Sequence, residues 1–71
     1  MDFERAVEKI VSRVKASKTP ALLSYDEINE WLKLSSGDDL IWAYDKLSER
    51  LTTDHSICLE LREDCVTAVS G

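Results

Sequence analysis

The chain has 71 residues, 44% hydrophobic and 32% charged, which is the composition of one small globular domain. With two glycines and one proline it has no long linker, and no apolar run approaches the roughly 20 residues that span a bilayer. The net charge of −5 favours basic partners and opposes nucleic acid, or simply reflects a solvated acidic surface.

The first predicted helix starts after Asp2, a suitable N-cap, and ends at Thr19-Pro20, because proline forces the preceding residue out of the helical region. Its apolar residues recur at helical spacing, namely Phe3, Ala6, Val7, Ile10, Val11 and Val14. We expect this stripe to face the core.

A second helix is predicted after the apolar run 21–23, which is too short for a helix and fits a small strand. Ser24 and Glu27 have the spacing of a capping box, which marks where the helix begins. The helix is expected to end near Leu34-Ser35. Its apolar side is expected to carry Tyr25, Ile28, Trp31 and Leu32, with Trp31 in the core.

The third predicted helix covers residues 36–51, with Ser36 as N-cap and two acids in its first turn. At 100° per residue one stripe consists of Leu40, Tyr44, Leu47 and Leu51, which we expect to be core. The opposite face carries Asp38, Asp39, Trp42, Lys46 and Glu49. Trp42 is therefore expected to be exposed, unless the first helix or a second copy covers it.

After residue 54 the apolar period changes from 3.6 to 2, which is typical of a half-buried strand. Residues 57–61 and 65–69 are expected to form an antiparallel hairpin with a turn at Glu63-Asp64. That pairing puts Cys58 opposite Ala68 or Val69, so the two cysteines are predicted to be free thiols.

No residue pattern in the chain indicates an enzyme, a metal site or a cofactor. His55 is the one histidine, and no serine or cysteine near it has a clear nucleophilic role. The metal-ligand spacings of cysteine and histidine are missing, and so is a glycine-rich phosphate loop. The paired acids fall in first turns of helices or in the hairpin turn, where they have structural roles.

The order of these elements, helix, short strand, helix, turn, helix and hairpin, resembles that of the winged-helix superfamily. Residues 23–28 are similar to the opening of its second helix, residues 39–47 to its third helix, and residues 59–69 to its wing strands. The resemblance implies an α+β domain over residues 1–71, with three helices and a C-terminal hairpin. An unrelated three-helix domain with a terminal hairpin is the alternative.

In DNA-binding winged helices the third helix enters the major groove with arginine, lysine, asparagine or glutamine on its exposed side. The resemblance puts five residues of this chain at the groove, and three of them are acidic: Asp38, Asp39, Trp42, Lys46 and Glu49. We therefore predict a protein-binding module that docks through these residues, with Trp42 as its centre. Antirepressors, inhibitors that mimic DNA and subunits of larger complexes all fit, and a basic or DNA-binding partner is favoured.

The basic flank of the first helix supports the alternative hypothesis. Residues 1–20 carry five basic and three acidic residues (net +2), whereas residues 21–71 carry four basic and eleven acidic residues (net −7). Arg5, Lys9 and Arg13 lie along one flank and are either solvated or a second candidate surface, for DNA or for the acidic front of a second copy. A dimeric DNA-binding regulator is thus the alternative function. Because the N-terminus lacks signal-peptide features, we expect a cytoplasmic protein, or a nuclear one in a eukaryote.

Overall fold

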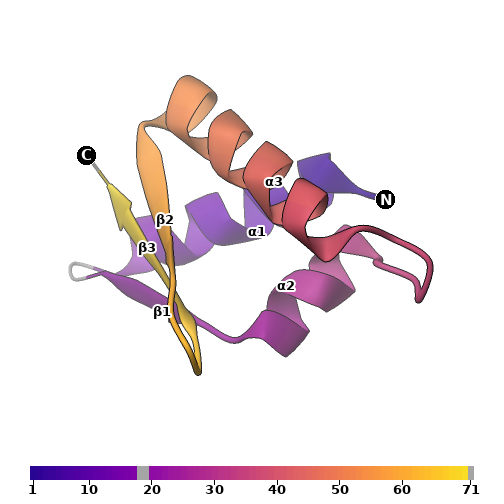
Figure 1. The fold of residues 1–71 in the computed structure, drawn as a ribbon. Coiled ribbons are helices and arrows are strands. Elements are labelled where there is room, and N and C mark those ends of the chain that lie inside the picture. The colour runs from indigo at the N-terminus through magenta and orange to yellow at the C-terminus, as the bar shows by residue number, and fades with distance from the viewer. Residues whose placement is uncertain (18–19, 71) are drawn as a thin grey trace.

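The computed structural model describes residues 1–17 and 20–70. It is an α+β domain in which three helices pack beside a three-stranded antiparallel sheet (Figure 1). In chain order the elements are α1 (Phe3–Ala16), β1 (Ala21–Leu23), α2 (Tyr25–Leu32), α3 (Leu40–His55), β2 (Ile57–Leu61) and β3 (Val66–Ser70).

The sheet has the order β1-β3-β2, so the last strand lies between the other two. Leu61 pairs with Val66 and Cys58 pairs with Val69, which confirms the predicted hairpin and selects one of the two registers left open by the sequence. The hairpin turn is closed by a 2.8 Å hydrogen bond from the Arg62 amide to the Cys65 carbonyl. The predicted short strand is β1, and Ala21 pairs with Ala68.

The starts of the first two helices are as predicted. The Asp2 side chain accepts a 3.0 Å hydrogen bond from the Arg5 amide and caps α1. Ser24 and Glu27 form the expected capping box of α2, with reciprocal bonds of 3.1 and 3.3 Å. Each cap satisfies amide groups that the first helical turn leaves without partners.

The first two helices end earlier than predicted. Helix α1 ends at Ala16 with Ser17 as its C-cap, whereas the expected terminator included Thr19, which lies outside the described residues. Helix α2 ends at Leu32, because Lys33 adopts a left-handed conformation with φ of 56° and turns the chain away.

The third helix begins at Leu40 and ends at His55, so the predicted bounds of 36–51 were wrong at both ends. The side chain of Asp38 accepts hydrogen bonds from the amide (2.9 Å) and the hydroxyl (3.0 Å) of Ser35, which closes a turn before the helix. Asp39, rather than Ser36, is then the N-cap and accepts from the amides of Ile41 and Trp42 at 3.0 and 3.2 Å.

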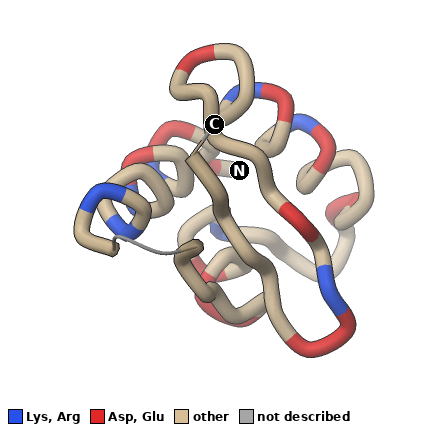
Figure 2. The backbone as a smooth tube through the Cα atoms, turned by 90° about the vertical axis from the view of Figure 1, so that its left-hand side faces the viewer, with Lys and Arg blue, Asp and Glu red and all other residues tan. Residues whose placement is uncertain are grey.

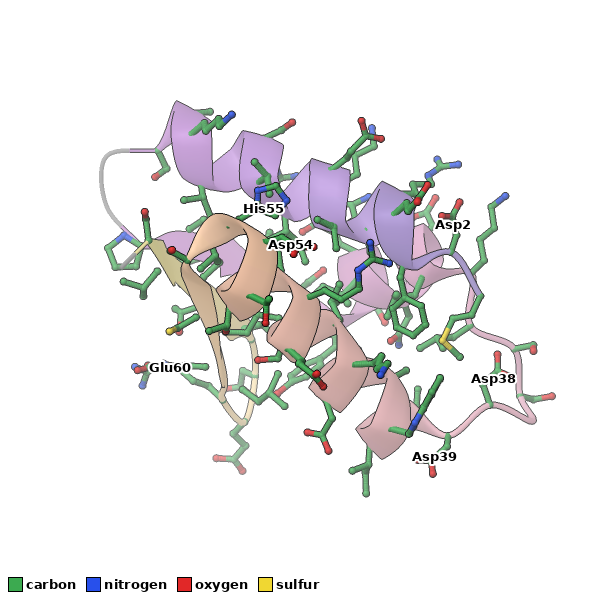
Figure 3. All side chains as sticks on the ribbon, turned by 90° about the horizontal axis from the view of Figure 1, so that it is seen from above. Asp2, Asp38, Asp39, Asp54, His55 and Glu60 are labelled. Carbon is green, nitrogen blue, oxygen red and sulfur yellow. The ribbon has the colours of Figure 1, made fainter. Side chains whose placement is uncertain are left out.

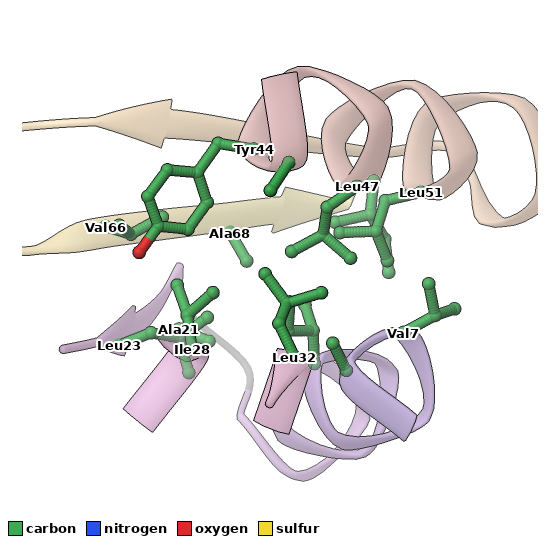
Figure 4. Close-up of a cluster of buried hydrophobic side chains, with 14 residues drawn as sticks. Val7, Ala21, Leu23, Ile28, Leu32, Tyr44, Leu47, Leu51, Val66 and Ala68 are labelled. Carbon is green, nitrogen blue, oxygen red and sulfur yellow. The ribbon is translucent and has the colours of Figure 1, made fainter. Parts of the chain in front are cut away.

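The core lies where the helices meet the inner face of the sheet (Figure 4). Leu47 and Leu51 of α3 are fully buried, as predicted, and Tyr44 is buried beside Val66 of the sheet. Leu40 is 49% exposed, so its assignment to the core was wrong. It is the first residue of α3, one turn before the buried Ala43 and Tyr44.

Trp31 packs against the core from its edge, half-buried rather than enclosed. No helix among residues 1–17 and 20–70 combines the length and the apolar character needed to cross a membrane.

Candidate interaction surface

The first turn of α3 exposes three consecutive apolar side chains. Ile41 is 77% exposed, Trp42 51% and Leu40 49%. We call these three residues the α3 apolar end. Successive helical residues point about 100° apart, so the three side chains fan out around the start of the helix rather than forming one stripe. Exposed apolar residues that occur together, unlike scattered ones, are typical of contact surfaces.

Trp42 forms one side of the α3 apolar end. Its ring packs edge-to-face on Phe3 of α1, with ring centroids 5.8 Å apart and an angle of 74° between the planes. Half of the side chain stays exposed, so both sequence expectations hold in part: the first helix supports the ring without covering it. The contact holds the ring in place, and an ordered aromatic side chain loses little entropy on binding.

On the other side, Leu40 and Ile41 line a groove of about 400 Å³ that we call the apolar groove. Leu61, at the end of β2, also lines this groove and is 54% exposed. Tyr25 of α2 and Tyr44 of α3 also line it, with ring centroids 5.9 Å apart in an edge-to-face arrangement. Residues from three elements thus form one apolar concavity.

The tyrosine hydroxyls of the apolar groove are hydrogen-bonded within the fold. Tyr44 donates to the side-chain oxygen of Asn29 at 2.5 Å. Tyr25 donates to the backbone carbonyl of Arg62, which ties the hairpin tip to α2. Burial raises the pKa of Tyr44, and the nearby Tyr25 and Asp26 raise it further, so the phenol stays protonated.

The predicted contact residues Asp38 and Asp39 have structural roles at the entrance to α3. They lie in the loop and cap that precede the helix (Figure 3). The hydrogen bonds from the backbone and side chain of Ser35 lower the pKa of Asp38, because they favour the charged carboxylate. Capping and turn formation therefore explain both acids without a partner.

Lys46 and Glu49 are exposed on α3, as expected for the outer face of the helix. Asp45 is also exposed and lines the apolar groove, although the sequence analysis did not single it out. The groove beside it also includes residues of α2 and β2, so only the tertiary structure reveals its position.

The basic flank of α1 forms a different kind of surface. Arg5, Lys9 and Arg13 are exposed along it. The Arg13 guanidinium lies 5.7 Å from the centre of the Trp31 ring and 3.1 Å from the Glu27 carboxylate. The pKa of Glu27 is lowered mainly by the Ser24 amide and then by Arg13. Lys9, Arg13 and Trp31 line a second groove, also of about 400 Å³, which we call the basic groove.

Basic and acidic positions occur on both α1 and the hairpin (Figure 2), but α1 has four basic and two acidic residues, whereas residues 60–64 have three acidic and one basic. Glu60 forms a 2.9 Å ion pair with Arg62, and Glu63 and Asp64 follow in the exposed turn. A DNA-binding wing would face phosphate with this acidic segment.

Neither cysteine forms a disulfide, as predicted: Cys58 is exposed and Cys65 is half-buried. His55 is the last residue of α3 and lies with Asp54 at the end of that helix remote from Asp39 (Figure 3). Within the described residues there is no group of three or more metal-binding side chains.

Comparisons of the chain with protein-family models, with curated proteins and with solved structures gave no match. The candidate surface therefore depends on the geometry above. Sequence analysis found Trp42 but missed the apolar groove. Two features of the sequence were consistent with such a groove: Leu40 and Ile41, which precede Trp42, and Tyr25, which begins α2.

Proposed function

We propose that this chain is a non-catalytic, protein-binding module of the winged-helix type that docks through the α3 apolar end. The element order and the β1-β3-β2 sheet are compatible with a winged helix. The observation that carries the proposal is the exposure of Leu40, Ile41 and Trp42 in the first turn of α3. Interface hot spots combine such apolar anchors with a polar surround.

The charges around α3 support a protein partner over DNA. Its exposed side carries Asp45 and Glu49 against Lys46, and the hairpin tip is acidic. Binding to DNA gains most of its affinity from neutralising phosphates, which neither element can do well. A basic or DNA-binding protein is the favoured partner, and a small regulator, an inhibitor or a complex subunit is the corresponding role.

The proposal is tested by affinity capture from the source organism with four immobilised proteins: wild type, Ile41→Asp, Trp42→Ala and Leu22→Asp. Leu22 is the matched control, because it is 67% exposed on β1, away from α3. We expect a partner that is retained by wild type and Leu22→Asp and lost with either α3 variant. Retention by all four proteins, or loss with Leu22→Asp as well, contradicts the proposal.

A second experiment tests the alternative of a dimeric DNA-binding regulator. Binding to a mixed-sequence DNA duplex is measured at low and at moderate salt for wild type and for a triple variant in which Arg5, Lys9 and Arg13 are glutamine. We expect no salt-sensitive binding by the wild type. Salt-sensitive binding that the triple variant loses would favour a DNA-binding function through α1.

A further inference from the structure

The walls of the apolar groove define what part of a partner enters it. Leu40 and Ile41 of α3 and Leu61 of β2 line it, and each of the three is about half exposed or more. Its volume of about 400 Å³ lies within the roughly 300–1,000 Å³ of ordinary ligand sites. Burying these side chains against a partner removes apolar surface from water, so the entering group must itself be apolar.

The two tyrosines in the groove do not call for a polar ligand. Tyr44 already donates to Asn29, and Tyr25 donates to the Arg62 carbonyl. A ligand hydroxyl or amide placed between these rings would lose its water without gaining those donors. A bulky aliphatic or aromatic side chain makes better use of the two rings, which already meet edge-to-face.

The charges around the apolar groove determine which residues of the partner can flank its apolar side chain. Asp45 lines the groove directly. Asp26, on α2, is close enough to raise the pKa of Tyr44. The hairpin tip with Glu63 and Asp64 is tied to the groove through Tyr25 and Arg62, and it is acidic in Figure 2. Arg62 itself is paired with Glu60, so the surroundings of the groove are net acidic.

We infer that the apolar groove binds a peptide segment of the partner that carries one bulky apolar side chain flanked by lysine or arginine. The apolar side chain enters between Leu40, Ile41 and Leu61, and the basic side chains lie against Asp45 and the hairpin tip. This inference rests on the proposed protein-binding function and adds the chemistry of the partner. Charge complementarity sets the choice of flanking residues and excludes acidic peptides.

The test is selection of short random peptides, displayed on phage, on the immobilised full chain, followed by affinity measurements with synthetic copies of the enriched peptides. We expect enriched sequences to share a leucine, isoleucine, methionine or aromatic residue with lysine or arginine close to it in the sequence. Enrichment of acidic peptides, or no enrichment at all, overturns the inference.

Variants then locate the binding. Asp45→Lys and Leu61→Asp should each weaken the basic–apolar peptide by about tenfold or more. Asp54→Lys is the matched charge control, since Asp54 is exposed at the far end of α3, and Leu22→Asp is the matched apolar control. Equal weakening by Asp45→Lys and Asp54→Lys overturns the inference, because it would show attraction by net charge alone.

The two proposals fail in different ways. A captured protein that depends on Ile41 and Trp42 but not on Asp45 or Leu61 leaves the protein-binding function standing and removes the basic–apolar peptide. If peptides bind through Asp45 and Leu61 while no protein depends on Ile41 or Trp42, docking through the α3 apolar end is wrong. Circular dichroism of every variant checks that the fold is kept.

Discussion

The apolar groove and the basic groove have about the same volume but opposite chemistry. Helix α2 contributes to both, with Tyr25 and Asn29 on one side and Trp31 on the other. In the basic groove the charge and the aromatic ring are already paired, since Arg13 contacts both Trp31 and Glu27. In the apolar groove the leucine and isoleucine walls still face solvent. The difference teaches that a groove is a better candidate for binding when its side chains do not already have partners within the fold.

The largest expected effect tests whether the exposed residues of the apolar groove are needed for folding. If they are, the contrast between the two grooves does not hold. Leu47 is fully buried on the same helix, so Leu47→Ala should lower the free energy of unfolding by about 2–5 kcal/mol. Ile41→Ala, on the exposed wall, should change it by less than about 0.5 kcal/mol. Trp42→Ala should lie between them, at about 1 kcal/mol, through loss of the Phe3 contact. Urea titrations of the three variants measure this, and equal losses for Leu47→Ala and Ile41→Ala would contradict the separation.

A smaller effect tests whether Arg13 in the basic groove is stabilised by its contact with Trp31. Arg13→Met keeps most of the aliphatic stem but removes the charge above Trp31, and should cost about 0.5–1 kcal/mol in the free energy of unfolding. Lys9→Met is the matched control, because Lys9 lines the same groove on the same flank, and we expect it to be neutral. Denaturant unfolding of both variants decides the point. If the two substitutions change the free energy of unfolding equally, Arg13 gains no more from the fold than Lys9 does, and the basic groove is not internally paired.

The smallest effect is a pH dependence from the carboxylates that the fold stabilises. Glu27 has a pKa lowered from 4.5 by the Ser24 amide and by Arg13, and Asp38 has a pKa lowered from 3.8 by Ser35. Because their folded pKa values lie below the unfolded ones, their stabilising contribution is present above about pH 4.5 and is lost as the pH falls through the folded values.

The expected result is a denaturation midpoint that declines below this pH, with a weaker decline in Glu27→Gln. Urea titrations at a series of acidic pH values measure it. A slope unchanged in Glu27→Gln and in Asp38→Asn would show that other groups cause the acid sensitivity.

Local patterns predicted the parts of the fold that depend on neighbouring residues. The capping box of Ser24 and Glu27 follows from spacing alone, and the length of the turn limits the partner of Cys58 to Ala68 or Val69, of which the structure has Val69. The start of α3 did not follow, because Ser36 and Asp39 both suit an N-cap. The choice depends on Asp38, whose bonds to Ser35 form a separate turn.

The candidate site was only half predictable for a related reason. The position of Trp42 opposite Leu47 is a property of one helix and can be found by counting residues. The apolar groove requires Leu61, Tyr25 and Ile41 to meet from three elements. No spacing within one element indicates such a meeting. The shift of the N-cap of α3 by three residues, from Ser36 to Asp39, also hid the exposure of Leu40.

The hydrogen bond from Tyr25 to the hairpin affects which substitutions the hairpin tip can accept. Its acceptor is the carbonyl of Arg62, which every amino acid possesses, so the bond does not depend on which side chain stands at that position. Substitutions at Arg62, Glu63 and Asp64 can therefore change the charge beside the apolar groove while the groove keeps its width. Under the proposed protein-binding function, the hairpin tip is therefore the place where substitutions would change the choice of partner.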